Sequence, residues 1–367
     1  MRLDFKIQLP NDILEINKIF KQNGFELFVV GGAVRDSLLF IEPKDFDLAT
    51  NAEPDTVERI MTEAGFRTLA TGKAFGVINV FTETNEFEIA TFRRDIGVGR
   101  RPDAVEFTTI EGDVQRRDLT CNALFYDINS EEIVDLVGGI SDIEKHIVKT
   151  VGPAKDRFNE DRLRILRAIR FAARFGSDLD DDIIGALLED NSLEGISGER
   201  IHDEFIKGIK SAKSVKEFLS IINLFDLFDW IFPKMKINKN FIEDKDPLVV
   251  MAKLLANNNI KTLAKDLNNL KFTGREIDII MFLIKFSKIE LEDVVDLKRE
   301  QMKCGVSKEQ IIKITVNSWV GMHFTIRFLE FQLSITGDFV MQEFGLKPGP
   351  ELGKKIKTLE LENFLKL

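Results

Sequence analysis

The stretch from Phe28 to Thr50 constrains the fold of this chain more than any other. The apolar run Leu27–Val30 precedes Gly31 and Gly32, and a helical pattern from Ala33 to Phe40 follows. This order predicts a strand, a glycine turn and the start of a helix. Because glycine has no side chain to obstruct its backbone, we expect the amides of the turn and the helix N-terminus to face an anion such as a triphosphate.

Two aspartates, Asp45 and Asp47, close this stretch. They lie two residues apart in a segment predicted to be a strand, so both carboxylates are expected on one face. Two carboxylates on one rigid edge can hold the magnesium ions that assist phosphoryl transfer. Glycine pairs and Asp-x-Asp pairs are each common, but their order and closeness here indicate the palm of a nucleotidyltransferase.

Composition limits the partners and the compartment. The 367 residues include 51 basic and 61 acidic side chains, a net charge of −10, which argues against non-specific binding of DNA or RNA but permits a local basic groove. The two cysteines form no disulfide framework, which favours a reducing cytoplasm. The chain shows no signal peptide and no apolar run long enough to span a bilayer, so no membrane partner is expected. The oligomeric state stays open.

The pattern along the chain predicts an α+β protein. From Met1 to Val148, short strands rich in branched and aromatic residues alternate with helices, which indicates a mixed sheet. A turn-rich, charged segment, Arg94–Asp103, interrupts these strands. From Asn159 onward helical patterns dominate almost to the end.

Glu88 is a candidate third catalytic carboxylate. It alternates with Phe87 and Ile89 in the predicted strand Glu86–Arg93, so it can face the edge that carries the aspartates. There it could complete a metal site or help to deprotonate an attacking hydroxyl. A surface glutamate paired with an arginine explains the pattern equally well.

The run Arg116-Arg117-Asp118 is more distinctive. At the start of a helix, it would set guanidinium groups beside a triphosphate and a carboxylate where a ribose hydroxyl could bind. Asp118 could equally be a helix N-cap, and both roles are compatible.

A second arginine-rich segment begins at Glu160-Asp161 and continues through Arg164, Arg167 and Arg170. On one helix, Asp161 and Arg164 would share a face. Their acceptor and donor match the Watson–Crick edges of cytosine and adenine, whereas guanine and uracil would place oxygen against carboxylate. An ordinary ion pair within the helix is the commoner explanation of such spacing, but the position behind a probable palm favours base recognition.

Five motifs occur in a fixed order: Gly31–Asp36 with Asp45-Phe46-Asp47, Arg116-Arg117-Asp118, Asp135 with Gly138-Gly139, Glu160-Asp161-x-x-Arg164, and Glu199-Arg200 with Glu204. In these motifs the chain resembles the class II tRNA nucleotidyltransferase and bacterial poly(A) polymerase family, and the CCA-adding enzymes in particular. Further on, Gly345–Pro350 resembles the start of the family's tail helix.

This resemblance implies a polymerase-beta-like palm in residues 1–148, an all-helical neck in 149–212 that recognises the base, and an all-helical body and tail in 213–367 that bind tRNA. It implies magnesium ligands at Asp45 and Asp47, while Glu88 stays the third catalytic candidate from its position in the predicted strand. The nucleotide would be bound by Gly31, Gly32, Arg35, Arg117, Asp118, Asp161, Arg164, Arg167 and Arg170. The implied reaction is attack of a tRNA 3′ hydroxyl on the α-phosphate of CTP or ATP, which releases pyrophosphate.

Several related activities remain alternatives. In the resembled family a loop after the Glu88 strand is needed for the switch from C to A, and Arg94–Asp103 is intact but somewhat compact. Full CCA addition is favoured over CC-only addition, A-only addition and poly(A) synthesis. A non-catalytic RNA-binding relative and a nucleotidyltransferase for small molecules are the competing classes. The scattered histidines do not predict a phosphohydrolase domain.

Overall fold

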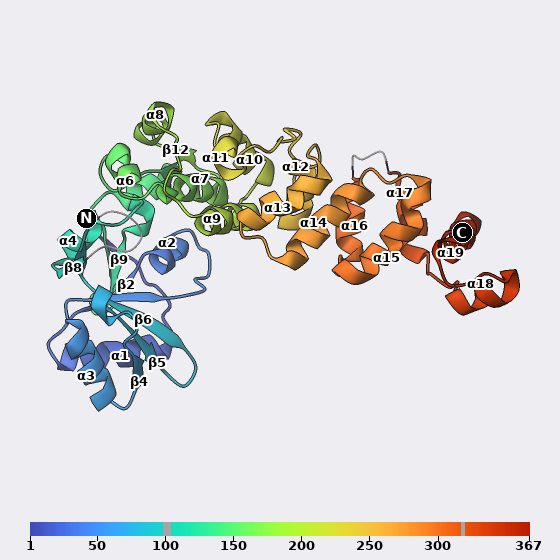
Figure 1. Ribbon diagram of the computed structural model, residues 1–367. Coiled ribbons are helices and arrows are strands. Elements are labelled where there is room, and N and C mark those ends of the chain that lie inside the picture. Colours follow the sequence, from blue (N-terminus) through green and yellow to red (C-terminus); the bar gives the residue numbers. More distant parts are fainter. Residues whose placement is uncertain (98–103, 317–319) are drawn as a thin grey trace. The chain divides into compact units, whose positions relative to one another are not determined.

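The computed structural model describes residues 1–97, 104–316 and 320–367 of the chain (Figure 1). It divides into two compact units, Met1–Ile196 and Ser197–Leu367. This boundary differs from the expected boundaries after residues 148 and 212, and the division into palm, neck, body and tail stays a prediction. No helix within the described residues is long and apolar enough to cross a membrane.

A mixed eight-stranded sheet forms the centre of the first unit, with the strand order β1-β10-β9-β2-β3-β6-β5-β4. Neighbouring strands are antiparallel except for β3 and β6, which are parallel. The strands are β1 (Arg2–Asp4), β2 (Leu27–Val30), β3 (Asp47–Thr50), β4 (Arg67–Leu69), β5 (Val77–Phe81), β6 (Glu86–Thr91), β9 (Phe125–Asp127) and β10 (Glu132–Val134). The predicted strand Leu27–Val30 and the mixed sheet are confirmed.

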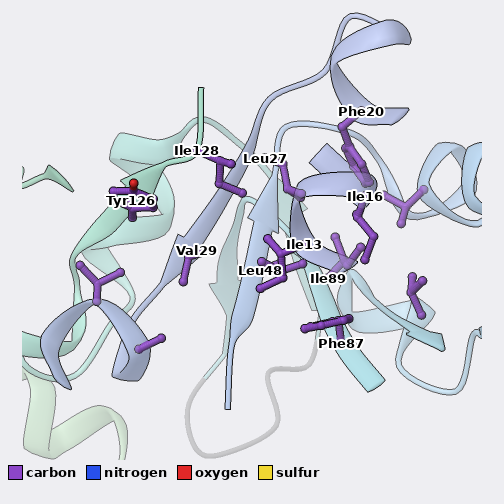
Figure 2. Close-up of a cluster of buried hydrophobic side chains, with 14 of the residues drawn as sticks. Ile13, Ile16, Phe20, Leu27, Val29, Leu48, Phe87, Ile89, Tyr126 and Ile128 are labelled. Atoms are coloured by element: carbon purple, nitrogen blue, oxygen red, sulfur yellow. The ribbon is translucent and has the colours of Figure 1, made fainter. Parts of the chain in front are cut away.

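The sheet buries both faces. Helices α1 (Asn11–Gln22) and α3 (Pro54–Glu63) cover one face, where Leu27, Val29 and Leu48 pack in a large apolar cluster (Figure 2). On the alternate face, Phe28 packs with Phe92 and Phe125. Because strand side chains alternate between faces, this arrangement fixes the register of β2 and β3, and with it the direction of Asp47.

The first unit also contains helices, two short strand pairs and 3₁₀ turns outside this sheet. They are α2 (Gly32–Leu38), η1 (Lys73–Phe75), β7 (Arg93–Ile96), β8 (Ala104–Phe107), α4 (Ile110–Gln115), η2 (Thr120–Asn122), α5 (Gly139–Glu144), β11 (Ile147–Val148), α6 (Ala154–Glu160), α7 (Leu163–Phe175), β12 (Asp178–Leu179) and α8 (Asp181–Glu189).

Two expectations for this region are wrong. The turn-rich segment Arg94–Asp103 begins as strand β7, which pairs with β8 in a separate hairpin, while residues 98–103 of the predicted loop lie outside the described residues. The part expected to be all-helical contains strand β12, whose backbone pairs in parallel with β11. In both cases pairing with a partner strand decided the structure of a short polar segment.

The second unit is helical. Its elements are α9 (Gly198–Ser211), α10 (Val215–Leu224), α11 (Phe228–Ile231), α12 (Pro247–Leu254), α13 (Ile260–Asn269), α14 (Gly274–Phe286), η3 (Leu291–Asp293), α15 (Val294–Cys304), α16 (Lys308–Thr315), α17 (Met322–Glu330), α18 (Gly337–Phe344) and α19 (Pro350–Lys366). The apolar helix α14 packs against α12, α13, α15 and α16 and is the centre of this unit (Figure 1). The expected helix start at Pro350 is confirmed.

Candidate active site

The glycine turn joins β2 to α2. Gly31 has a φ of 67°, a left-handed conformation that side chains strongly disfavour. A Cβ atom there would lie 3.5 Å from the Asn122 carbonyl oxygen and 3.6 Å from Arg117 Nη1. The Gly31 amide donates to the carbonyl oxygen of Leu124, 3.0 Å away, so it does not face an anion as expected. Gly32 begins α2, where the first amides of a helix have no partner within the helix.

The three candidate carboxylates lie together where β3 runs beside β6, two interior strands of the sheet. Asp47 is the first residue of β3, and Asp45 precedes the strand instead of lying within it. Residues Leu48 and Ile89 are partners in the parallel β3–β6 pair, which sets Asp47 beside Glu88. The three side chains are exposed to solvent.

Their charges act on one another. Although the Asp47 side chain is exposed, the protein around it removes part of the water that would stabilise its charge, and this desolvation raises its pKa. The positive charge of Arg117 lowers the pKa, and the negative charge of Asp45 raises it. Partial burial likewise raises the pKa of Glu88, and the negative charges of Asp47 and Glu86 raise it further. Glu88 forms no ion pair with any arginine among the described residues, so the surface ion pair considered for it is not seen there.

This cluster fits a hydrated divalent cation. No group of three His, Cys, Asp or Glu side chains within the described residues converges as a complete metal site. Mg²⁺ does not require one, because it keeps several waters and binds one or two carboxylates together with substrate phosphates. The adjacent Asp45 and Asp47 supply the hard oxygen donors and the excess negative charge that such an ion requires.

Arg117 connects the glycine turn to these carboxylates. Its guanidinium lies over the ring of Phe125 at 4.7 Å from the centroid and donates to the Asn122 carbonyl oxygen at 3.3 Å. Its charge acts on Asp47. The expected helix at Arg116-Arg117-Asp118 is wrong, because α4 ends at Gln115 with Arg116 as its C-cap, and only the short 3₁₀ turn η2 follows.

Asp118 lies opposite Arg167 of α7. Its Oδ2 atom accepts from Arg167 Nε at 2.7 Å and is 2.6 Å from Nη2. Its Oδ1 atom accepts from the Leu119 amide and from Asn122 Nδ2. Asp118 is not the N-cap of η2, which is Leu119. Two of the predicted nucleotide-binding residues therefore meet although 49 positions separate them.

Arg35 joins α2 to α7. Its side chain is buried, and its guanidinium donates to Asp36 and to Asn122 Oδ1. It lies 5.0 and 5.2 Å from the ring centroids of Phe171 and Phe175. Arg170, also predicted to bind the nucleotide, is buried over the same Phe171 ring at 4.2 Å. Both residues lie close to the site, with their cations packed against aromatic faces.

The proposed base readers do not share a helix. Asp161 has extended backbone between α6 and α7, and its Oδ1 atom accepts from the Leu163 amide. Arg164 is in the first turn of α7, where it pairs with Glu160 at 2.5 Å and donates to the Arg116 carbonyl oxygen at 3.1 Å. The expectation of one shared face is wrong because the break before α7 places Asp161 outside the helix.

Sequence reasoning missed Asp113. This carboxylate, in α4, binds the side chains of both Arg116 and Arg117. Its spacing of three and four residues from the two arginines is the signal that could have found it.

The downstream motifs have structural contacts of their own. The Asp135 carboxylate accepts from the backbone amides of residues 137–140, which lead into the first turn of α5. A Cβ atom at Gly139 would lie 2.3 Å from the Thr120 carbonyl oxygen, so this turn requires glycine. In the second unit, His202 bonds to Asp203 and packs against the ring of Phe272.

The chain is similar to one family model over part of its length and to known proteins over nearly all of it. The family model described as the poly A polymerase head domain matches residues 27–149. The CCA-adding enzyme of Lactococcus lactis is 30% identical over 386 aligned positions, which cover 96% of this chain and 93% of the relative. The CCA-adding enzyme of Streptococcus sanguinis is 31% identical, with 98% and 94% covered.

Solved structures agree in fold. The structure of the Bacillus stearothermophilus CCA-adding enzyme in complex with CTP aligns with a TM-score of 0.73 at 23% identity and covers 96% of this chain and 92% of that one. The Thermotoga maritima CCA-adding enzyme complexed with tRNA gives a TM-score of 0.71 at 19% identity, with 97% and 92% covered. From its end-to-end similarity to the curated relatives, the chain belongs to the CCA-adding enzymes, a family of nucleotidyltransferases.

Proposed function

We propose that this protein adds CCA to the 3′ end of tRNA without a nucleic-acid template, using CTP and ATP. The observation that carries the proposal is that the charges of Asp45 and Arg117 both act on Asp47, at the start of β3 and beside Glu88 of β6. Family membership supports the same activity, because the full-length relatives are CCA-adding enzymes.

In this proposal Asp45 and Asp47 hold Mg²⁺, which when bound neutralises phosphate charge and favours ionisation of the attacking hydroxyl. Gly32 and Arg117 contact the triphosphate, and Asp118 accepts from a ribose hydroxyl. Arg35 stabilises the glycine turn, and it contacts the triphosphate when a phosphate oxygen replaces Asn122 as its hydrogen-bond acceptor. Glu88, beside Asp47, is the candidate general base that deprotonates the tRNA 3′ hydroxyl, because its raised pKa lies closer to neutral pH.

Base selection falls to Asp161 and Arg164. The structure without nucleotide has Arg164 bonded to Glu160 and to the Arg116 carbonyl oxygen. Recognition of cytosine or adenine then requires the guanidinium to exchange one of these partners for a base acceptor. Arg167 and Arg170 support the site through Asp118 and the Phe171 ring.

Positioning and charge compensation account for the chemistry assigned to this chain. Attack of a 3′ hydroxyl on an α-phosphate needs an in-line approach and stabilisation of charge on the transferring phosphoryl group. The rigid sheet that carries the carboxylates supports the in-line approach, and the arginines of the site stabilise the charge on the phosphoryl group. A cytoplasmic location belongs to the same proposal, as tRNA is the acceptor, and both cysteines are free thiols.

The test is extension of a tRNA that lacks its last three nucleotides, with CTP, ATP and magnesium, followed by sizing of the product. Growth by three nucleotides supports the proposal. Growth by two or one would show a partial enzyme, and a long tail would show a poly(A) polymerase. No growth with any tRNA tested would favour a non-catalytic RNA-binding protein or an enzyme for small molecules.

A further inference from the structure

One carboxylate behind the site binds both arginines of the Arg116-Arg117 pair. Asp113, in α4, is 1% exposed. Its Oδ1 atom accepts from Arg116 Nε at 2.9 Å and is 2.8 Å from Nη2. Its Oδ2 atom accepts from Arg117 Nε at 3.0 Å and lies at the same distance from Nη2. Each oxygen therefore receives one guanidinium in a forked contact.

The carboxylate is itself held in place. The backbone amide of Arg93, at the start of the β7–β8 hairpin, donates to Asp113 Oδ1 at 3.2 Å. Contacts thus reach the group from the segment after α4 and from the hairpin. A buried carboxylate fixed from two segments has one orientation, and it imposes that orientation on its arginine partners.

The charge balance gives a reason for this arrangement. Burial lowers the pKa of Arg117, and the adjacent positive charge of Arg116 lowers it further, whereas Asp113 raises it. Two neighbouring guanidinium groups repel each other, and a buried one without a counter-charge is costly. The negative charge of Asp113 therefore compensates the two neighbouring positive charges of Arg116 and Arg117 and makes the burial of Arg117 less costly.

Arg117 transmits this constraint to the nucleotide site. Its Nη1 atom donates to the Asn122 carbonyl oxygen and would lie 3.6 Å from a Cβ atom at Gly31. Its Nε and Nη2 atoms are both occupied by Asp113. The Nη1 side of the guanidinium therefore faces the glycine turn.

We infer that Asp113 is a positioning residue for nucleotide binding, which fixes Arg117 so that one edge of its guanidinium meets the triphosphate. Asp113 contacts neither the nucleotide nor the reacting atoms and acts through Arg117. This inference rests on the proposed function and adds a residue to its site.

The test compares Asp113→Asn and Asp113→Ala with Asp127→Asn. Asp127 is a matched control, because its carboxylate also accepts from backbone amides, those of Asn129 and Ser130, and its arginine partner is Arg2, 3.8 Å away, instead of Arg116 or Arg117. We expect Asp113→Asn to raise KM for both CTP and ATP about tenfold, which corresponds to one hydrogen bond to a charged group, with kcat changed less than threefold. The Asp113→Ala change should raise KM further, and the control should leave it unchanged.

A double-mutant cycle separates positioning from general stability. If Asp113 acts through Arg117, adding Asp113→Asn to an Arg117→Ala variant should raise KM no further. A fully additive effect would overturn the inference, as would a lower melting temperature with unchanged KM. Equilibrium binding of CTP gives the same comparison without turnover, so it tests Asp113 even if the wild-type protein extends no tRNA.

Discussion

Asp118 and Arg167 form an ion pair that joins the segment after α4 to helix α7, with Nε and Nη2 of Arg167 at 2.7 and 2.6 Å from one carboxylate oxygen. Burial on its own would raise the pKa of Asp118, but Arg167 and the hydrogen bonds from Leu119 and Asn122 outweigh it and hold the pKa below the usual range. The pair therefore links two parts of the nucleotide site and stabilises the fold.

The first prediction concerns the pH dependence of this pair. A carboxylate whose pKa is lowered by folding adds stability above its unfolded pKa, about 3.9, and loses it as the pH falls through the lower folded value. Arg167→Ala should lower the melting temperature at pH 7, and the difference from wild type should shrink as the pH falls below about 4. Thermal unfolding from pH 7 to pH 3 measures this, and a constant difference would contradict it.

The second prediction concerns the carboxylates proposed to bind magnesium. Asp47→Asn should reduce nucleotide addition by at least about 10²-fold, as loss of a key electrostatic group does. Without magnesium, the same change should raise the melting temperature, because the pKa of ionised Asp47 is raised by folding and its charge therefore costs stability at neutral pH.

Magnesium should raise the melting temperature of the wild type and leave Asp47→Asn almost unchanged. Glu83→Ala, at an exposed carboxylate of the same unit, is the control and should behave like wild type in both measurements. An equal response of wild type and Asp47→Asn to magnesium would remove Asp47 from the metal site.

The third prediction concerns base choice. Arg164→Ala should reduce the preference for CTP and ATP over UTP and GTP by about 10- to 100-fold, in line with 1–3 kcal/mol for a two-bond contact to a base edge. Arg162→Ala is the control, because Arg162 lies two positions away and pairs with Asp190. Single-nucleotide incorporation with each of the four triphosphates measures the preference. Unchanged selectivity in Arg164→Ala would end its assignment as a base reader.

The fourth prediction concerns the glycine turn. Gly31→Ala and Gly65→Ala should both lower stability by roughly 1–2 kcal/mol, because both positions have positive φ. Only Gly31 has Arg117 and the Asn122 carbonyl within 4 Å of the added Cβ, whereas nothing lies that close at Gly65. Nucleotide addition should therefore fall in Gly31→Ala alone. Equal activity in the two variants would show that the turn contributes only backbone geometry.

Much of this site could be predicted from the sequence, because the patterns that indicate it involve residues close together in the chain. The apolar run, the glycine pair and the alternation of Glu88 with Phe87 and Ile89 predicted a strand edge with carboxylates, and the structure places Glu88 beside Asp47. Such signals depend on residues two to four positions apart, whose relative directions the backbone sets by itself.

Other expectations failed where a single residue interrupts a regular element. Asp161 and Arg164 have helical spacing, yet extended backbone at Asp161 separates α6 from α7. Likewise Arg116 caps the C-terminus of α4 instead of opening the next helix. Helix ends depend on tertiary partners: carbonyl oxygens at the end of α4 accept from Arg157 and Arg164, which are distant in sequence.

The sequence by itself determined the family motifs, the α+β class and the mixed sheet, since these follow from residue order and local periodicity. Only the tertiary structure decided which groups from distant segments meet: Asp118 with Arg167, and Arg35 with the aromatic rings of α7. The physical reason is that a buried charge must find a partner, and folding brings that partner from segments whose separation along the chain carries no signal.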